Sequence, residues 1–304
     1  MKTLKDFSFK GKRALIRVDF NVPLNTTKEV TDATRIEAAL PTISYILRQG
    51  GSVVLMSHLG RPSGGYEADY SLSHIVSTLS GLLGKAVEFA GDCIGEQSYS
   101  VTNNLGEGKV VLLENLRFHN EEKKGDSAFA EKLSKHGDIY INDAFGTAHR
   151  AHASTAIIAS FFEGNSCFGL LMQKELESVR KVMQNSAKPF TAIIGGAKVS
   201  SKISIIQNLM DKLDNLIIGG GMSYTFVKAM GGRVGDSLVE DKYLEEAKAI
   251  LNIAEDKGVR ILIPEDSIIA DAFDNNANRK TVDSSEIPDG WMGLDIGANA
   301  IEHY

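Results

Sequence analysis

Four arginines in the first half of the chain, Arg35, Arg61, Arg117 and Arg150, are well suited to binding a small charged ligand. Each follows a short apolar or turn-bounded run. A planar guanidinium binds carboxylate and phosphate oxygens bidentately. Ligands of α/β proteins bind beyond the carboxyl ends of the strands, where these arginines would lie. Together they predict a site for a small phosphorylated acid, although any one alone could be a solvated surface residue.

Other polar residues of the first half allow two interpretations. Asp19 and Asn21, in the segment DFNVP, could contact a ligand or could be turn formers that bond to nearby backbone. His58, His149 and His152 lie near predicted strand ends, and no carboxylate at a readable spacing orients any of them. A histidine at a sheet rim is more often structural than a base, so the pattern assigns these three no catalytic role.

The segment IIGGAKVSSK is the sharpest signal of the second half. Gly195 and Gly196 are predicted to end a strand, and Lys198 and Lys202 to open the next helix on one face. Free amides at a helix start attract anions, and two lysines can neutralise a transferring phosphoryl group. The pattern indicates a site for nucleotide phosphates, although it is not a Walker A loop.

Three consecutive glycines, Gly219, Gly220 and Gly221, form a second predicted strand-to-helix turn in IIGGGM. They do not complete the dinucleotide fingerprint GxGxxG, because Tyr224 stands where its last glycine is required. The turn is equally consistent with phosphate binding and with tight packing of a helix on a strand.

In the first half, apolar runs alternate with helical patterns. Strands are predicted at 13–18, 52–56, 110–113 and 138–141, with helices near 34–48, 71–83 and 126–135. Solid apolar runs of this kind are typical of a parallel sheet covered on both faces.

An amphipathic helix, LLMQKELESVRKVMQ, follows and is expected to end before the breakers Asn185, Ser186 and Pro189. A second series continues beyond it. Its strands are predicted in TAIIGG, NLIIGG and VRILI, with helices near 200–212, 222–230 and 240–256 and a polar loop or hairpin turn at 275–280. The predicted organisation is an N-terminal domain over 1–168, a connecting helix over 169–186 and a second domain over 187–304.

Composition favours an ordinary two-domain enzyme of 304 residues, in which 33 Lys and Arg against 39 Asp and Glu give a net charge of −6. Positive charge confined to loops argues against nucleic-acid binding. Cys93 and Cys167 lie far apart, without disulfide or zinc spacing, which fits a reducing cytoplasm. The start MKTLKDFSF has no apolar signal region, and no apolar run reaches 18 residues, so neither secretion nor a membrane span is expected.

Seven segments occur in the order found in one known family: RVDFNVP, SHLGRP, LENLRF, NDAFGTAHRAHAS, GGAKVSSK, IIGGGM and GWMGLDIG. From about Lys5 to its last residue the sequence resembles phosphoglycerate kinase. The resemblance implies two Rossmann-like α/β domains joined by a hinge helix, with 3-phosphoglycerate on the first and magnesium nucleotide on the second. It also implies a monomer whose domains close on the substrates.

The resemblance also implies site residues. The 3-phosphoglycerate contacts would be Asp19, Phe20, Asn21, Arg35, His58, Leu59, Gly60, Arg61, Arg117 and Arg150. The nucleotide contacts would be Gly195, Gly196, Ala197, Lys198, Lys202, Gly219, Gly220, Gly293 and Leu294.

The implied reaction transfers a phosphoryl group between ATP and the carboxylate of 3-phosphoglycerate, or from 1,3-bisphosphoglycerate back to ADP. The carboxylate is already ionised, so catalysis needs positioning and charge neutralisation rather than a protein nucleophile or a strong base. Arg35 and Lys198 are expected to neutralise the transition state.

Two family strings, WNGPMGVFE and a GGGDS-type turn, do not occur in this sequence. The segment that carries them holds magnesium in the family, so a partial second domain and no magnesium ligand within this chain are expected. One alternative is therefore a chain that binds 3-phosphoglycerate without catalysing transfer. A nicotinamide-dependent oxidoreductase is the other alternative, and the missing GxGxxG argues against it.

Overall fold

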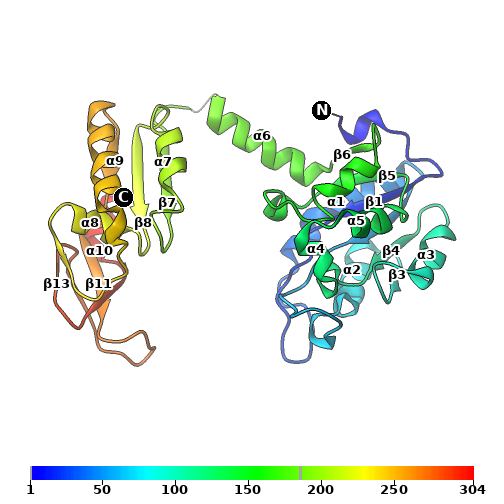
Figure 1. The fold of residues 1–304 in the computed structure, drawn as a ribbon, viewed down its shortest axis with the longest axis horizontal. Coiled ribbons are helices and arrows are strands. Elements are labelled where there is room, and N and C mark those ends of the chain that lie inside the picture. The colour runs from blue at the N-terminus through cyan, green and yellow to red at the C-terminus, as the bar shows by residue number, and fades with distance from the viewer. Residues whose placement is uncertain (1, 185–186) are drawn as a thin grey trace. The chain divides into compact units, whose positions relative to one another are not determined.

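The computed structural model describes residues 2–184 and 187–304 and divides the chain into two compact units, Met1–Val179 and Arg180–Tyr304. The division falls within helix α6 (Leu170–Gln184), which is the amphipathic helix predicted to connect the domains (Figure 1). Asn185 and Ser186, the predicted helix breakers, lie outside the described residues. The two units are described separately below.

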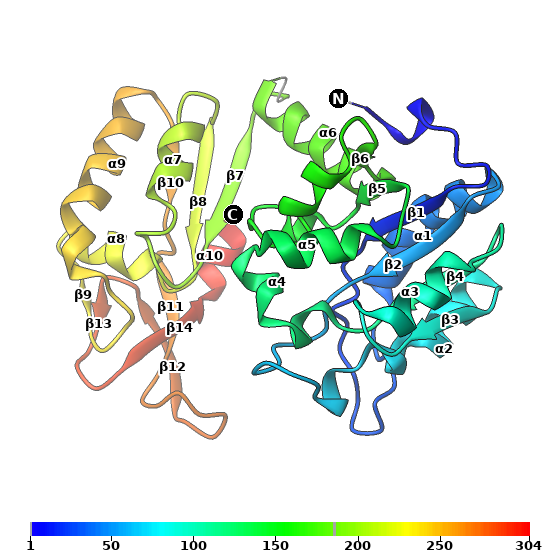
Figure 2. The same cartoon turned by 45° about the vertical axis from the view of Figure 1, so that its right-hand side comes forward.

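The first unit is built on one sheet of six parallel strands in the order β3-β4-β2-β1-β5-β6 (Figure 2). The strands are β1 (Arg13–Arg17), β2 (Ser52–Met56), β3 (Val87–Ala90), β4 (Val110–Leu113), β5 (Ile139–Asn142) and β6 (Ser166–Phe168). Their parallel arrangement brings all six carboxyl ends to the same edge of the sheet.

Both faces of this sheet are buried, which explains the solid apolar runs. Along β1 and β2, Ile16 and Leu55 pack in one core, while Leu15 and Val54 pack in another on the opposite face. Helices α1 (Thr34–Arg48) and α2 (Val76–Leu83) contribute to the first core, and α5 (Ser127–Ser134) contributes to the second. The prediction of a doubly covered parallel sheet is confirmed.

Some elements of the first unit carry too weak a pattern to be predicted. These are β3, β6, α3 (Glu96–Asn103) and α4 (Asn120–Lys124). Helix α3 buries the polar residues Ser98 and Thr102 instead of an apolar stripe, and β6 has only three residues. The helix predicted near 71–83 is a 3-10 turn, Leu72–Ile75, followed directly by α2.

The second unit contains a parallel sheet of three strands in the order β10-β8-β7. These strands are β7 (Thr191–Gly195), β8 (Asn215–Gly219) and β10 (Arg260–Leu262). The helices that accompany them are α7 (Ile203–Leu209), α8 (Ser223–Ala229) and α9 (Leu244–Asp256). Ile206, Leu216, Phe226 and Ile250 share the core between sheet and helices.

An antiparallel sheet completes the second unit and was not predicted. Its order is β12-β11-β14, with strands β11 (Asp266–Ala270), β12 (Arg279–Asp283) and β14 (Met292–Ile296). A parallel pair, β9 (Arg233–Val234) with β13 (Glu286–Ile287), and the short helix α10 (Ala298–His303) accompany it. Residues 275–278 lie in the hairpin connection between β11 and β12, as predicted, whereas 279–280 already belong to β12.

The α/β class is therefore confirmed, and the second unit adds antiparallel strands to it. Strand β12 escaped prediction because its sequence, RKTVD, is mostly exposed and lacks an apolar alternation. Within the described residues, no helix has both the length and the apolar character needed to cross a membrane.

A buried histidine links α3 to α5 in the first unit. His136 follows α5; its Nε2 donates to the carbonyl of Cys93 at 3.0 Å and its Nδ1 lies 2.8 Å from the hydroxyl of Thr102. Burial lowers the pKa of His136 from its ordinary value of 6.5 to about 4. The folded protein therefore holds this imidazole neutral at a pH where the unfolded chain protonates it.

Replacing His136 with glutamine should change the pH dependence of stability. Above pH ~6.5 the imidazole is neutral in both states, and His136 adds no pH dependence. As the pH falls toward 4, His136 becomes protonated in the unfolded state but stays largely neutral in the folded state. This difference lowers the free energy of unfolding by up to about 3 kcal/mol. The variant should be less stable at neutral pH, with a gap that shrinks by this amount on acidification.

Amide hydrogen exchange of the slowest protons in β1 and β5, measured near pH 7 and near pH 4.5, gives the stability of the first unit in each protein. A gap of the same size at both pH values would contradict the low pKa of His136.

Candidate active site

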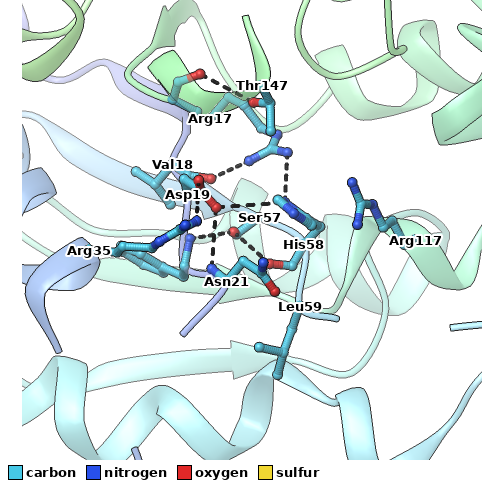
Figure 3. A network of polar contacts seen from close by, with 12 residues as sticks. Arg17, Val18, Asp19, Asn21, Arg35, Ser57, His58, Leu59, Arg117 and Thr147 are labelled. Carbon is cyan, nitrogen blue, oxygen red and sulfur yellow. Dashed lines mark hydrogen bonds and ion pairs between the residues drawn. The ribbon is translucent and has the colours of Figure 1, made fainter. Parts of the chain in front are cut away.

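The predicted arginine site lies along the carboxyl edge of the first unit's sheet. Asp19 follows β1, and its Oδ2 accepts a bond of 2.7 Å from Nη1 of Arg35 at the start of α1 (Figure 3). The same carboxylate offers Oδ1 at 3.9 Å from Nδ1 of His58, which follows β2. Asp19 thus lies between a cation from α1 and an imidazole from the neighbouring strand.

Asn21 and Gly60 lie in the same two loops as Asp19 and His58, and Arg117 adds the loop after β4. The Asn21 side-chain oxygen accepts from the amide of Gly60 at 2.8 Å, and Arg117 donates to the Gly60 carbonyl at 2.8 Å. Gly60 has a φ of +62°, and a Cβ there would lie 2.3 Å from the ring of Tyr70, so glycine is required. Asn21 is therefore more than a local turn former, since it connects loops 39 residues apart in sequence.

His58 is buried among cations, and this sets its charge. Burial lowers its pKa to about 2, and the guanidiniums of Arg17, Arg117, Arg150 and Arg35 add to the effect in that order. The imidazole is consequently neutral at physiological pH. Arg150, which comes from the loop after β5, is therefore near enough for its charge to act on His58.

The other predicted substrate residues differ in accessibility. Arg61 is exposed directly after Gly60. Phe20 and Leu59 are buried in the core beneath the loops, so their side chains support the site from below. Two hollows flank the loops, one of about 270 Å³ lined in part by Asn21 and Gly60, and one of about 220 Å³ lined in part by Asp19 and Arg35.

Arg17, Ser154 and Glu122 belong to this site but were missed from the sequence. Arg17 is only 1% exposed, although it ends a strand whose three central residues are apolar. Its Nε donates to the Ser154 hydroxyl at 2.9 Å, and that hydroxyl donates to the buried carboxylate of Glu122 at 2.6 Å. The sequence held one indication of a buried functional charge, which is the position of Arg17 inside the apolar run RALIRV.

The carboxylates beside the histidines also come from distant parts of the sequence. His58 faces Asp19, and Nδ1 of His152 lies 3.8 Å from Glu122. The spacing of residues along the chain could not reveal either neighbour, because the loops meet only when the strands align in parallel.

In the second unit, the predicted placement of the two lysines on one helix face is wrong. Helix α7 begins at Ile203, so Lys202 caps its start and Lys198 lies in the preceding turn. The carboxylate of Glu240 fixes this turn, because it accepts hydrogen bonds from the Ser200 amide at 2.9 Å and from the Ser200 hydroxyl at 2.7 Å. Lys198 is exposed and Lys202 half-buried beside the glycines that end β7.

The two glycine turns of the second unit pack directly against each other. Gly195 pairs with Gly219 at the ends of β7 and β8, and the Gly196 carbonyl accepts from the amide of Met222 at 2.8 Å. Gly220 has a φ of +68°, and a Cβ on it would lie 2.9 Å from the Gly196 nitrogen. Close packing therefore explains these glycines, and it also brings the main chains of both turns together.

Gly293 and Leu294, the remaining predicted nucleotide residues, lie on β14. The amide of Gly293 donates to the Ser237 hydroxyl at 2.9 Å, and a Cβ on Gly293 would lie 2.2 Å from the hydroxyl of Tyr224 in α8. Leu294 is 44% exposed. Gly293 thus lies against the helix that follows the triple-glycine turn.

The described residues contain one group of three acidic, histidine or cysteine side chains with donor atoms within 4.8 Å of one another: Asp92, Cys93 and His119. Its thiol and imidazole do not suit magnesium, which prefers oxygen ligands. The group also belongs to the first unit, whereas the glycine turns belong to the second. No residue described in the structure is therefore assigned to magnesium.

Comparisons with known proteins agree on one family. The family model described as "Phosphoglycerate kinase" matches residues 4–304. A relative from Porphyromonas gingivalis, "Phosphoglycerate kinase", is 48% identical and a relative from Nicotiana tabacum, "Phosphoglycerate kinase, cytosolic", is 51% identical; each alignment covers 99% of this chain and, respectively, 78% and 75% of the relative.

A solved phosphoglycerate kinase from Coxiella burnetii is similar in structure, with a TM-score of 0.80 and 35% identity over 99% of this chain and 75% of that one. These matches give no support to a nicotinamide-dependent oxidoreductase or to a binding-only module. The chain belongs to the phosphoglycerate kinase family, a family of phosphotransferases that act in glycolysis.

Proposed function

We propose that this chain binds 3-phosphoglycerate or 1,3-bisphosphoglycerate at the carboxyl edge of the first unit and ATP or ADP at the glycine turns of the second. The observation that carries the proposal is the convergence of Arg35, Arg117 and Arg150 around His58 and Asp19. Phosphate and carboxylate oxygens are the ligands that such a cluster favours.

In this proposal the arginines and polar loop residues bind and orient the substrate. Arg61, Arg117 and Arg150 neutralise its charge, while His58 contributes a neutral donor. Asp19 orients Arg35 through their bond of 2.7 Å. Phe20 and Leu59 support the loops from the core, and main-chain groups near Asn21 and Gly60 complete the binding surface.

The chemical step needs no protein nucleophile. A carboxylate oxygen of 3-phosphoglycerate attacks the γ-phosphorus of ATP, the bond between that phosphorus and the bridging oxygen breaks, and ADP leaves; the reverse reaction regenerates ATP. The attacking carboxylate is already ionised, so the protein supplies orientation and charge neutralisation. Arg35 and Lys198 are the residues proposed to neutralise the charge on the transferring group.

For the nucleotide, the proposed contacts are the turns at Gly195–Lys198 and Gly219–Gly220, together with Lys202 and the β14 residues Gly293 and Leu294. Glycine places no side chain of its own over the main chain of these turns, and close approach to phosphate oxygens requires this. Lys198 and Lys202 supply positive charge beside those amides.

Magnesium is proposed to accompany the nucleotide as the cofactor, bound to its phosphates and neutralising part of their charge. The residues described here do not offer a suitable set of oxygen ligands, so no step is assigned to a protein-bound ion.

We further propose a monomeric, cytoplasmic enzyme that acts on small molecules and has no nucleic-acid or membrane partner. A net charge of −6 with positive charge gathered at a few loops supports the exclusion of nucleic acid. Light scattering of the purified chain would measure its oligomeric state, and fractionation of the source cells its location.

The experiment that tests the proposed function is ATP-dependent phosphorylation of 3-phosphoglycerate by the purified 304-residue chain. The Lys202→Ala variant, prepared in parallel, reports any contaminating kinase. Turnover that is lost in the variant supports the proposal. Binding of 3-phosphoglycerate without turnover contradicts the proposed catalysis, and failure to bind it contradicts the proposed acceptor site.

Replacing Arg35 with alanine should lower kcat by roughly 10²-fold, since preorganised donors that act mainly in the transition state contribute on this scale. Arg48 lies exposed at the other end of the same helix, so Arg48→Ala is a matched control that should retain the unsubstituted rate. Steady-state kinetics of both variants measure the difference. An unchanged kcat in Arg35→Ala would remove Arg35 from the catalytic assignment.

Replacing Lys198 with alanine should likewise lower kcat by roughly 10²-fold while 3-phosphoglycerate binding stays unchanged, because its charge lies in the unit proposed to hold the nucleotide. The control is Lys248→Ala, which removes an exposed lysine of α9 that pairs with Glu245 at 2.9 Å. Kinetics and calorimetric titration with each substrate separate the two effects. Equal rates in the two variants would contradict the role given to Lys198.

A further inference from the structure

Arg17 is the one charged side chain among the largest fully buried residues of the described structure. Its guanidinium donates to the carbonyl of Val18 and to Nδ1 of His58 at 3.1 Å (Figure 3). It also donates to the Ser154 hydroxyl at 2.9 Å. These partners lie on the loops that follow β5, β1 and β2. One side chain therefore joins three loops of the candidate active site.

The contact between Arg17 and His58 has only one chemically consistent form. A guanidinium carries five N–H donors and no acceptor, so Nδ1 of His58 must be the acceptor. A neutral imidazole that accepts at Nδ1 carries its proton on Nε2. The other candidate partner of Nδ1 is Asp19, but its Oδ1 lies 3.9 Å away, beyond hydrogen-bond distance.

The Nε2 atom of His58 has no hydrogen-bond partner among residues 2–184 and 187–304, and the side chain is 5% exposed. Its N–H is therefore free to donate to a ligand oxygen. If the proton lay on Nδ1 instead, Nε2 would present a lone pair, which repels the oxygens of an anion. The location of one proton decides whether His58 attracts or repels the proposed substrate.

Ser154 and Glu122 fix the position of Arg17. Ser154 donates to Oε1 of Glu122 from its hydroxyl at 2.6 Å and to Oε2 from its amide at 3.0 Å. The buried carboxylate of Glu122 also supplies the largest favourable charge interaction felt by the Arg17 guanidinium. A buried cation needs such compensation, because burial alone disfavours the charged form.

We propose that Arg17 is a positioning residue that locks His58 in the Nε2–H tautomer, so that the imidazole donates to the anionic substrate. The proposal rests on the proposed function for the identity of that substrate, 3-phosphoglycerate. The hold of Arg17 on His58 itself is a property of the free protein and can be measured without a ligand.

The first measurement is a long-range ¹H–¹⁵N spectrum of the histidine rings in the ligand-free protein. His58, assigned by comparison with His58→Gln, should show an unprotonated Nδ1 and a protonated Nε2. In Arg17→Met, which removes the donors but keeps an unbranched side chain, His58 should change to the other tautomer or to a mixture of both. Glu122→Gln removes the carboxylate that accepts from Ser154 but leaves Arg17 in contact with His58, so it should retain the original tautomer.

Because Arg17→Met leaves the Glu122 carboxylate buried without its cation, the double variant Arg17→Met/Glu122→Gln removes both charges and guards against a folding defect. It should show the same altered tautomer as the single variant. Each variant that loses the tautomer should bind 3-phosphoglycerate roughly 10-fold more weakly, the scale of one hydrogen bond to a charged group. Its affinity for ATP should be unchanged, which would show that the second unit is intact.

Two results would overturn the proposal: a protonated Nδ1 in the unsubstituted protein, or an unchanged tautomer and unchanged 3-phosphoglycerate affinity in both Arg17 variants. Failure of the unsubstituted protein to bind 3-phosphoglycerate is a different outcome. It would contradict the proposed function and with it the role of His58 toward that substrate, while the spectra would still decide whether Arg17 sets the tautomer.

Discussion

Repulsion among guanidiniums at one sheet edge is the constraint on which the candidate active site depends. Burial disfavours the charged form of Arg117, and the guanidiniums of Arg17 and Arg150 disfavour it further. Burial also disfavours the charge of Arg17. Two carboxylates offset this repulsion: Asp19 bonds directly to Arg35, and Glu122 acts on Arg17 through Ser154. An excess of positive charge remains, so an anionic ligand relieves repulsion that the fold itself maintains.

A neutral His58 follows from the same constraint. A fifth cation at this position would add to the repulsion, and burial disfavours it further, which is why the pKa of His58 falls to about 2. The loop after β2 therefore contributes a polar donor without adding charge. The site combines exposed cations such as Arg61 with a part-buried framework of hydrogen bonds that joins the loops.

The sequence predicted the framework of the first unit well because its strands are buried on both faces. Apolar runs such as 52–56 coincide with β2, and parallel pairing then places the residues after each strand at one edge. Arg17 was missed because a charge inside an apolar run gives no indication of its partners. The error at Lys198 and Lys202 has a similar cause, since Glu240, which shapes their turn, lies 40 residues from Ser200. Pattern predicts local elements, whereas contacts between distant loops come from the fold.

In the proposed function, the two units recognise anions by different physical means. In the first, side chains carry the charge, and hydrogen bonds from Arg17 to Ser154 and from Arg117 to the Gly60 carbonyl hold two of them in place. In the second, the turns at Gly196 and Gly220 touch through their main chains, where a Cβ would collide. Removing one arginine from the first unit deletes one charge from a surface that several loops share. Adding a single methyl group at Gly220 would separate two turns at once, because its backbone conformation and its contact with Gly196 both exclude a side chain. The fold of the second unit therefore depends on the absence of side-chain volume at these two turns, whereas its proposed activity depends on the charges of Lys198 and Lys202.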